Sequence, residues 1–297
     1  MKLKVQGVIS AMTTPFTKGG ESVDYDKIGS LAETLVKQGA KGLFPCGTTG
    51  EGMLLTPAER KVVVEEVVQA VGRKATVICQ TGYLDAATTI ELTRHAQEAG
   101  AHAAAIVAPG FYAYDDMSLE KYYTSVAKAV DGFPILLYNI PSCARNVLTP
   151  SFVLRMAEKV ENIVGIKDSS GNMGALTQML ANAPKDFVVI NGVDEYGFQA
   201  ILAGCPAAVS GLSNVVCEIY AAVFNHLEKG DMKKAWAEQK RLERAARIFE
   251  YGRKLAVFKE GQRLRGFGGG YVRPPMRELT TAEKKQLALD MHGLGVI

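Results

Sequence analysis

The sequence predicts an α/β fold, a (β/α)8 TIM barrel that is followed by a C-terminal helical extension. Short apolar runs alternate with longer amphipathic, helix-patterned segments as far as about residue 228. Eight such pairs occur, joined by short links that carry glycine or proline. The apolar runs show no polar alternation, which is typical of parallel strands covered on both faces. No glycine-rich fingerprint follows the first run, which disfavours an open, doubly wound sheet.

The elements follow one another in a regular order. The expected strands are 5–12, 42–46, 76–80, 103–108, 134–138, 163–167, 187–191 and 207–210. The expected helices are 24–38, one that starts at Thr56, 85–99, 118–130, 149–160, 172–181, 195–203 and 215–229. Thr56 suits the N-cap, with Pro57 at N1 and Glu59 at N3. From about residue 230 the pattern is helical without strands, over 232–258 and 281–291. We therefore expect a barrel over residues 1–229 and the extension over 230–297.

Composition and charge exclude several classes of protein. The chain has 297 residues, 47% hydrophobic and 22% charged, and its net charge is 34 − 31 = +3 with the signs interleaved. A weak, dispersed charge predicts no nucleic-acid partner. The uncharged stretch between Glu195 and Glu218 contains a turn at 204–206 and several polar residues, so we expect no membrane span. The five cysteines form no C-x-x-C pair, and no signal-peptide core opens the chain, which predicts free thiols and a cytoplasmic protein.

Two reactive side chains end neighbouring strands, where barrels carry their catalytic groups. Lys167 ends the sixth strand, and a desolvated amine there suits attack on a carbonyl group. A lysine that extends to solvent or pairs with a carboxylate is the alternative. Tyr138 ends the fifth strand and suits proton transfer, although a buried structural tyrosine is equally common.

Polar groups at three further strand ends are candidates for substrate binding. The loop Gly47-Thr48-Thr49-Gly50-Glu51 offers backbone N–H groups and two hydroxyls to a carboxylate, or is only a turn. The seventh strand continues into Asn191-Gly192-Val193-Asp194-Glu195, whose carboxylates suit sugar hydroxyls, although Asp194 is also a plausible helix N-cap. We add Ser210, which ends the eighth strand, to the expected substrate-binding residues.

Metal and nucleotide chemistry have no sequence support. The four histidines fall in helices, at the amino end of a strand or in the tail, away from the expected barrel mouth. The phosphate-binding patterns G-x-x-x-x-G-K-[ST] and G-x-G-x-x-G after a strand do not occur. We therefore expect an enzyme with no metal and no cofactor.

Three motifs together resemble one family. Gly47-Thr48-Thr49-Gly50-Glu51, Tyr138-Asn139-Ile140-Pro141 and Gly165-Ile166-Lys167-Asp168 stand in the order and spacing of the dihydrodipicolinate synthase/N-acetylneuraminate lyase family. The resemblance covers nearly the whole chain. It implies that Lys167 forms a Schiff base with pyruvate or a 2-oxo acid and that Tyr138 relays protons. It also implies that Thr48 and Thr49 hold the carboxylate, and that the protein is a homotetramer.

Departures from the synthase pattern bear on the substrate. The position of the synthase arginine is Cys143 here, and Arg145 stands two residues later. Phe111 takes the place of the tyrosine that enters a neighbouring site in the synthases, and Tyr112 is a possible substitute after a small shift. The run 191–195 is similar to the Asn-Gly-Tyr-Asp-Glu of N-acetylneuraminate lyases, and Ser169 matches a hydroxyl position of those lyases.

We therefore expect a metal-independent, Schiff-base aldolase whose substrates are pyruvate and an aldehyde. Its full-length substrate is expected to be a 2-oxo-3-deoxy sugar acid or an N-acetylneuraminate-like compound. The alternatives are 4-hydroxy-tetrahydrodipicolinate synthase, which joins pyruvate to aspartate semialdehyde, and a dehydratase that uses the same lysine. A non-catalytic, metabolite-binding relative is a further alternative, which the intact Lys167 and Tyr138 disfavour.

Overall fold

Eight parallel strands close into a barrel in the computed structural model, which describes residues 2–249 and 254–297. Each strand pairs with the next, and the last pairs with the first through Gly7 and Ala207. The strands are β1 (Gly7–Ser10), β2 (Gly42–Leu43), β3 (Thr76–Gln80), β4 (Ala103–Val107), β5 (Ile135–Asn139), β6 (Ile163–Asp168), β7 (Val188–Asn191) and β8 (Ala207–Ser210). Their residues are almost all buried, as the continuous apolar runs require, and the predicted barrel is confirmed.

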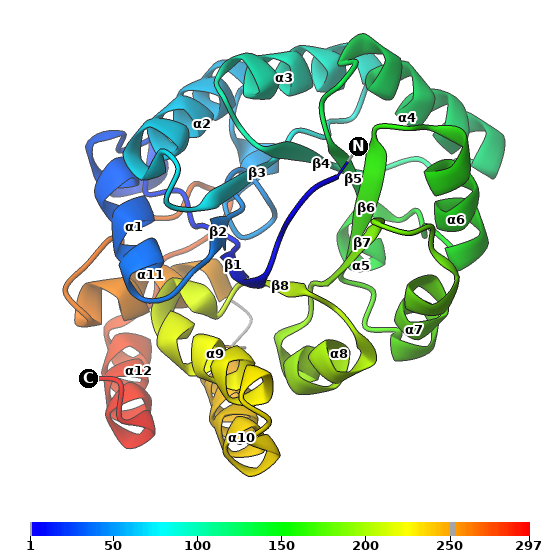
Figure 1. The fold of residues 1–297 in the computed structure, drawn as a ribbon. Helices are drawn as coiled ribbons and strands as arrows, with labels where there is room; N and C mark the ends of the chain where they lie inside the picture. The colour runs from blue at the N-terminus through cyan, green and yellow to red at the C-terminus, as the bar shows by residue number, and fades with distance from the viewer. Residues whose placement is uncertain (1, 250–253) are drawn as a thin grey trace.

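Helices form a ring around the barrel (Figure 1). Several of these helices begin at a residue whose side chain caps the first turn, and Thr56 and Glu59 make the expected capping box. The α-helices of the ring are α1 (Asp26–Lys37), α2 (Pro57–Val71), α3 (Ala86–Glu98), α4 (Asp116–Ala129), α5 (Pro141–Ala144), α6 (Pro150–Lys159), α7 (Met173–Asn182), α8 (Gly197–Ala203) and α9 (Ser213–Glu228). Three 3₁₀ turns, η1 (Lys18–Gly20), η2 (Gly52–Leu54) and η3 (Asp194–Tyr196), lie in loops.

The C-terminal extension consists of helices, as predicted. They are α10 (Met232–Phe249), α11 (Lys254–Leu264) and α12 (Thr281–Leu294). Helix α10 packs along α9, and α12 contacts both α10 and α11, so the extension covers one side of the barrel (Figure 1). The predicted helix over 232–258 is two helices, and its residues 250–253 lie outside the described residues.

Two further features of the described residues bear on the sequence predictions. No helix among them is both long and apolar enough to cross a membrane. All five cysteines are free thiols, and four of them are buried.

Candidate active site

The ends of β5 and β6 bring a tyrosine and a lysine together. The strand register pairs Tyr138 with Lys167, so both side chains point to the same face of the sheet. Lys167 is only 5% exposed, and its Nζ lies 4.0 Å from the ring centroids of both Phe44 and Tyr138. Within residues 2–249 and 254–297, no carboxylate lies within ion-pair distance of this amine. The amine therefore lies against aromatic faces and has no fixed counter-ion among these residues.

The loop after β2 contributes a hydroxyl next to the tyrosine. The hydroxyl groups of Thr48 and Tyr138 are 3.3 Å apart, within hydrogen-bond distance. The Phe44 ring packs edge-to-face on Tyr138, with 5.7 Å between centroids. A Cβ at Gly47 would lie 2.7 Å from Cε1 of Phe44, so a glycine is required for the loop to pass this ring. Local packing thus fixes the phenol beside the threonine.

A cavity of about 310 Å³ opens above the lysine. Eight of the residues that the sequence predicts for the site line it: Thr48, Thr49, Tyr138, Lys167, Ser169, Gly192, Asp194 and Glu195. A Cβ at Gly192 would lie 2.1 Å from the Ser169 Oγ, so glycine leaves this hydroxyl its place at the cavity. The cavity therefore has an amine and a phenol on one side, with hydroxyls and two carboxyl groups around them.

Asp194 has a shifted acidity. Burial raises its pKa to about 6, against the hydrogen bonds from the Ser210 hydroxyl and from the Leu212 and Gly211 N–H groups, which lower it. The Leu212 N–H donates to Oδ2 at 3.2 Å. No basic side chain among the described residues lies within ion-pair distance of Asp194. Near neutral pH the group is an ionised but weakly solvated acceptor, suited to hydroxyl donors of a ligand.

Four predicted site residues do not line this cavity. Ser210 is fully buried, and its hydroxyl accepts a hydrogen bond from the Ser213 N–H at 3.0 Å, so it acts on the cavity through Asp194. Arg145 is exposed and ends α5 in a left-handed conformation. Tyr112 is 64% exposed. Gly47 lines a neighbouring cavity of about 370 Å³ instead. Contact between these four residues and a substrate stays a prediction.

The apolar wall of the cavity is the part that the sequence did not predict. It includes Phe249 and Phe258 from the extension, Leu212 from the loop after β8, and Ala11, Ile140, Val193, Val209 and Ala246. An apolar residue in a buried helix has the same pattern whether it packs in the core or faces a cavity. The sequence predicted the helical extension that carries Phe249 and Phe258, but not that these side chains face the cavity.

The described residues contain no group of three or more histidine, cysteine, aspartate or glutamate side chains that could hold a metal ion.

Comparison with known proteins identifies the family. The model of the dihydrodipicolinate synthetase family matches residues 4–293. The chain belongs to this family. Its members are class I, pyruvate-dependent aldolases, so the predictions of the family and of a carbon–carbon lyase are confirmed.

Named relatives span the whole chain. A 4-hydroxy-tetrahydrodipicolinate synthase from Symbiobacterium thermophilum is 35% identical, over 98% of this chain and 98% of the relative. An uncharacterized DapA-like lyase from Halobacterium salinarum is 32% identical, over 99% of this chain and 96% of the relative. Among solved structures, YagE, a prophage protein of the dihydrodipicolinic acid synthase family from E. coli K12 in complex with pyruvate, superposes with a TM-score of 0.94. It is 30% identical, over 99% of this chain and 100% of that chain.

Proposed function

We propose that this member of the family is an aldolase that cleaves or forms a 2-oxo-3-deoxy sugar acid through a Schiff base on Lys167. The observation that carries the proposal is the buried Lys167 amine, which borders the cavity beside Tyr138 and has no carboxylate partner among the described residues. An amine in such a place is positioned to attack the carbonyl carbon of a ligand in the cavity. The relative solved in complex with pyruvate supports pyruvate as the three-carbon unit.

The proposed reaction proceeds through an imine and then an enamine on Lys167. The Lys167 amine adds to the C2 carbonyl to give a carbinolamine, and uptake of one proton with loss of water gives the protonated imine. The Tyr138 and Thr48 hydroxyls, which are within hydrogen-bond distance of each other, relay the proton of the C4 hydroxyl: the Tyr138 oxygen accepts it while the Tyr138 proton moves to the Thr48 oxygen, whose own proton is released. The C3–C4 bond breaks, an aldehyde leaves, and the electron pair moves into the imine to give an enamine. Protonation at C3 and hydrolysis then release pyruvate and the free amine.

Thr48 and Thr49 are proposed to hold the carboxylate of the substrate. Both line the cavity with the reacting lysine, so a bound carboxylate would fix the adjacent carbonyl for attack. Ser169, Asp194 and Glu195 line the same cavity and are proposed to accept or donate hydrogen bonds to the hydroxyls of the aldehyde part. This polar lining supports a polyol substrate.

The second candidate is 4-hydroxy-tetrahydrodipicolinate synthase. The names of several relatives favour it, including the one from Symbiobacterium thermophilum. The single-chain geometry gives it less support, because Cys143 occupies the position where those synthases carry an arginine and Arg145 is exposed outside the cavity. The dehydratase alternative uses the same lysine and is separated from both by its products.

A substrate panel tests the proposal. The chain is assayed with 2-oxo-3-deoxy sugar acids, with N-acetylneuraminate, and with pyruvate plus aspartate semialdehyde. We expect pyruvate to be released from at least one sugar acid, with no release by Lys167→Ala. Turnover of aspartate semialdehyde alone would replace the sugar-acid assignment with the synthase. A 2-oxo product formed without release of pyruvate would identify a dehydratase.

We further propose a homotetramer in the cytosol. Exposed apolar side chains line the cavity of about 370 Å³ that Gly47 also lines, and others lie in the loop before α4, in the first turn of α4 and between α5 and α6; they support contact with another copy of the chain. They are Met53 at 49%, Leu84 at 55%, Phe111 at 76%, Tyr112 at 64%, Met117 at 80% and Val147 at 54% exposed. Sedimentation equilibrium is expected to give four times the chain mass. A monomer at micromolar concentration would remove both the tetramer and the role of Tyr112 in a neighbouring site.

A further inference from the structure

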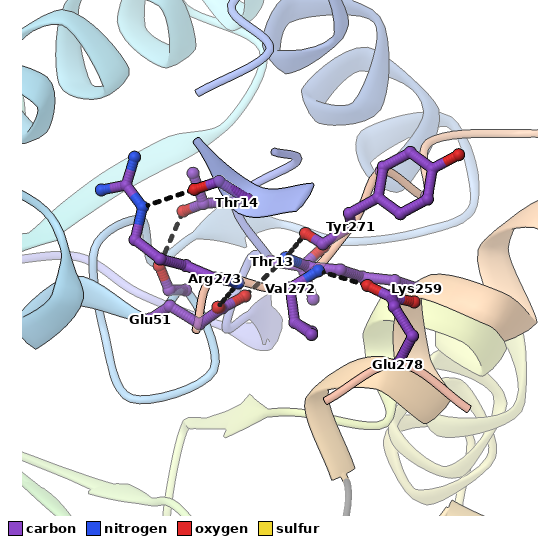
Figure 2. Close-up of polar contacts among 12 residues, drawn as sticks. Thr13, Thr14, Glu51, Lys259, Tyr271, Val272, Arg273 and Glu278 are labelled. Atoms are coloured by element: carbon purple, nitrogen blue, oxygen red, sulfur yellow. Dashed lines mark hydrogen bonds and ion pairs between the residues drawn. The ribbon is translucent and has the colours of Figure 1, made fainter. Parts of the chain in front are cut away.

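A buried ion pair joins the C-terminal extension to the loop that carries Thr48 and Thr49. Lys259 of α11 donates to Glu51 of the loop after β2 at 2.5 Å, and neither side chain is exposed at all. The two residues are separated by 208 positions. Lys259 also donates to the Tyr271 carbonyl (Figure 2). Its Nζ lies 4.6 Å from the ring centroid of Phe16. The pair is therefore fully enclosed by protein.

Arg273 adds a second connection at the same place. Its backbone N–H donates to Oε2 of Glu51 at 2.9 Å, so both carboxylate oxygens are engaged by the extension (Figure 2). Its guanidinium forms a two-pronged contact with Glu59, at 2.7 and 2.8 Å, and donates to the Leu54 carbonyl. The loop is thus held at Glu51 by Lys259, and near the start of α2 by Arg273.

Stability alone does not explain a sealed ion pair. Desolvation raises the pKa of Glu51 and lowers that of Lys259, and in each case the partner's charge opposes the shift. An apolar pair of similar volume is often as stable as a buried ion pair. What the ion pair adds is a fixed geometry between the two segments, because a hydrogen-bonded charge pair tolerates little displacement.

Glu51 is built into the turn that presents the threonines. It adopts a left-handed conformation with φ of 55°, and its N–H donates to the Thr48 carbonyl at 3.1 Å. A left-handed non-glycine residue is disfavoured by itself and persists where contacts hold it. The two carboxylate contacts from the extension are such contacts. Movement of the Glu51 side chain would therefore change the turn on which Thr48 and Thr49 lie.

Helix α11 also contacts the loop after β1 and lines the cavity. Gln262 donates to the Thr13 hydroxyl at 3.1 Å, and the neighbouring Thr14 hydroxyl donates to the Gly50 carbonyl at 2.7 Å. Phe258 lines the cavity itself. Residues 258, 259 and 262 of α11 therefore contact the cavity, Glu51 and Thr13, respectively.

We propose that Lys259 is a positioning residue: through Glu51 it sets the turn 47–51, so that docking of α11 fixes the Thr48 and Thr49 hydroxyls for binding the carboxylate of the substrate. This inference rests on the proposed role of the two threonines. The C-terminal extension then contributes to pyruvate affinity through Lys259, a residue that does not touch the substrate.

Three variants of the full chain test the proposal. Lys259→Met breaks the pair. The double variant Glu51→Gln/Lys259→Met leaves no buried charge and keeps an acceptor for the Arg273 N–H, but it removes the connection to α11. Arg265→Met is the matched control, since Arg265, directly after α11, also connects the extension to the barrel, through Glu218 of α9, without touching the loop. Pyruvate affinity is measured from the concentration dependence of borohydride trapping on Lys167, and stability is measured by thermal unfolding.

Wild-type trapping is measured first, because its failure would contradict the proposed function, and with it this inference, before any variant is compared. With trapping established, we expect the dissociation constant for pyruvate to rise about tenfold, equivalent to about 1.4 kcal/mol, in Lys259→Met and in the double variant. Saturating pyruvate still labels Lys167 fully in both. The double variant is expected to unfold close to the wild-type temperature, which separates positioning from stability.

The control and the double variant also define the results that would contradict the proposal. Arg265→Met is expected to lower the unfolding temperature while the pyruvate dissociation constant stays at the wild-type value. A double variant with wild-type affinity would overturn the proposal, and so would an equal loss of affinity in Arg265→Met. If Lys259→Met alone does not fold, the double variant still gives the deciding measurement.

Discussion

Two lysines are buried among the described residues, and their surroundings differ in a way that separates chemistry from architecture. Lys167 borders a cavity, lies against two aromatic rings and has no carboxylate partner among those residues. Lys259 is sealed, ion-paired with Glu51 and hydrogen-bonded to a backbone carbonyl. A buried amine beside empty space is available to a carbonyl compound, whereas a sealed amine with an anionic partner is not. The same residue type thus serves as nucleophile at one place and as a structural cation at the other.

The same substitution at both lysines gives the largest expected effect. We expect Lys167→Met to lower kcat by at least about 10³-fold, because no other group in the cavity can form the imine. Its unfolding temperature should stay near that of the wild type, since the change removes an amine that has no ion-pair partner among the described residues. Steady-state kinetics and thermal unfolding measure the two quantities. Retained turnover with lost stability would reverse the roles of the two lysines.

Tyr138→Phe sharpens the assignment at the cavity. Loss of the hydroxyl beside Thr48 is expected to lower kcat by about 10²- to 10³-fold through loss of proton transfer. The imine should still form, so borohydride should still trap pyruvate on Lys167. The ring is kept, and with it the packing against Phe44. An unchanged kcat would exclude Tyr138 from the proton relay.

Lys259→Met is expected to show the opposite pattern. It leaves the Glu51 carboxylate buried without its cation, which typically costs about 3–5 kcal/mol of unfolding free energy. At saturating pyruvate the folded enzyme should keep kcat within about threefold of the wild type, because the side chain touches no reacting atom. Denaturant unfolding and kinetics below the transition measure both. A kcat loss as large as that of Lys167→Met would contradict the comparison.

The smallest effect concerns Asp194, a carboxyl group that lacks the kind of partner Glu51 has. Burial raises its pKa to about 6, so the folded protein keeps this proton to a higher pH than the unfolded chain, which loses it near a pH of about 4. The group therefore stabilises the fold at low pH, and this contribution is lost as the pH rises from about 4 to about 6. Relative to Asp194→Asn, the wild-type unfolding temperature should fall across this range and run parallel above it. Parallel curves throughout would show that the carboxyl group is not perturbed.

The sequence predicted the strands and helices of the barrel well, because the patterns that specify them lie within short segments of the chain. Strands 76–80 and 207–210 have the predicted bounds, and the Thr56 capping box forms as expected. β2 is shorter than predicted, at Gly42–Leu43. The four-residue helix α5 was not predicted, since so short an element has no periodicity to detect.

Site residues were predictable where their chemistry and their place at a strand end coincide, as for Lys167 and Tyr138. The direction of each side chain was not predictable. Ser210 accepts a hydrogen bond from a backbone N–H and does not line the cavity. The contact between Glu51 and Lys259 could not be predicted from the sequence, for a different reason. Nothing in a single sequence pairs residues 208 positions apart, and a lysine in a charged helical segment is typical of a solvated face.

Mapping of the trapped lysine tests the central claim most directly. The chain is incubated with pyruvate, reduced with borohydride and digested, and the peptides that contain Lys167 and Lys259 are compared by mass spectrometry. We expect one reduced pyruvate adduct per chain on Lys167 and none on Lys259, and no adduct in Lys167→Met. An unlabelled Lys167 at saturating pyruvate, or an equal adduct in the Lys167→Met variant, would contradict the account.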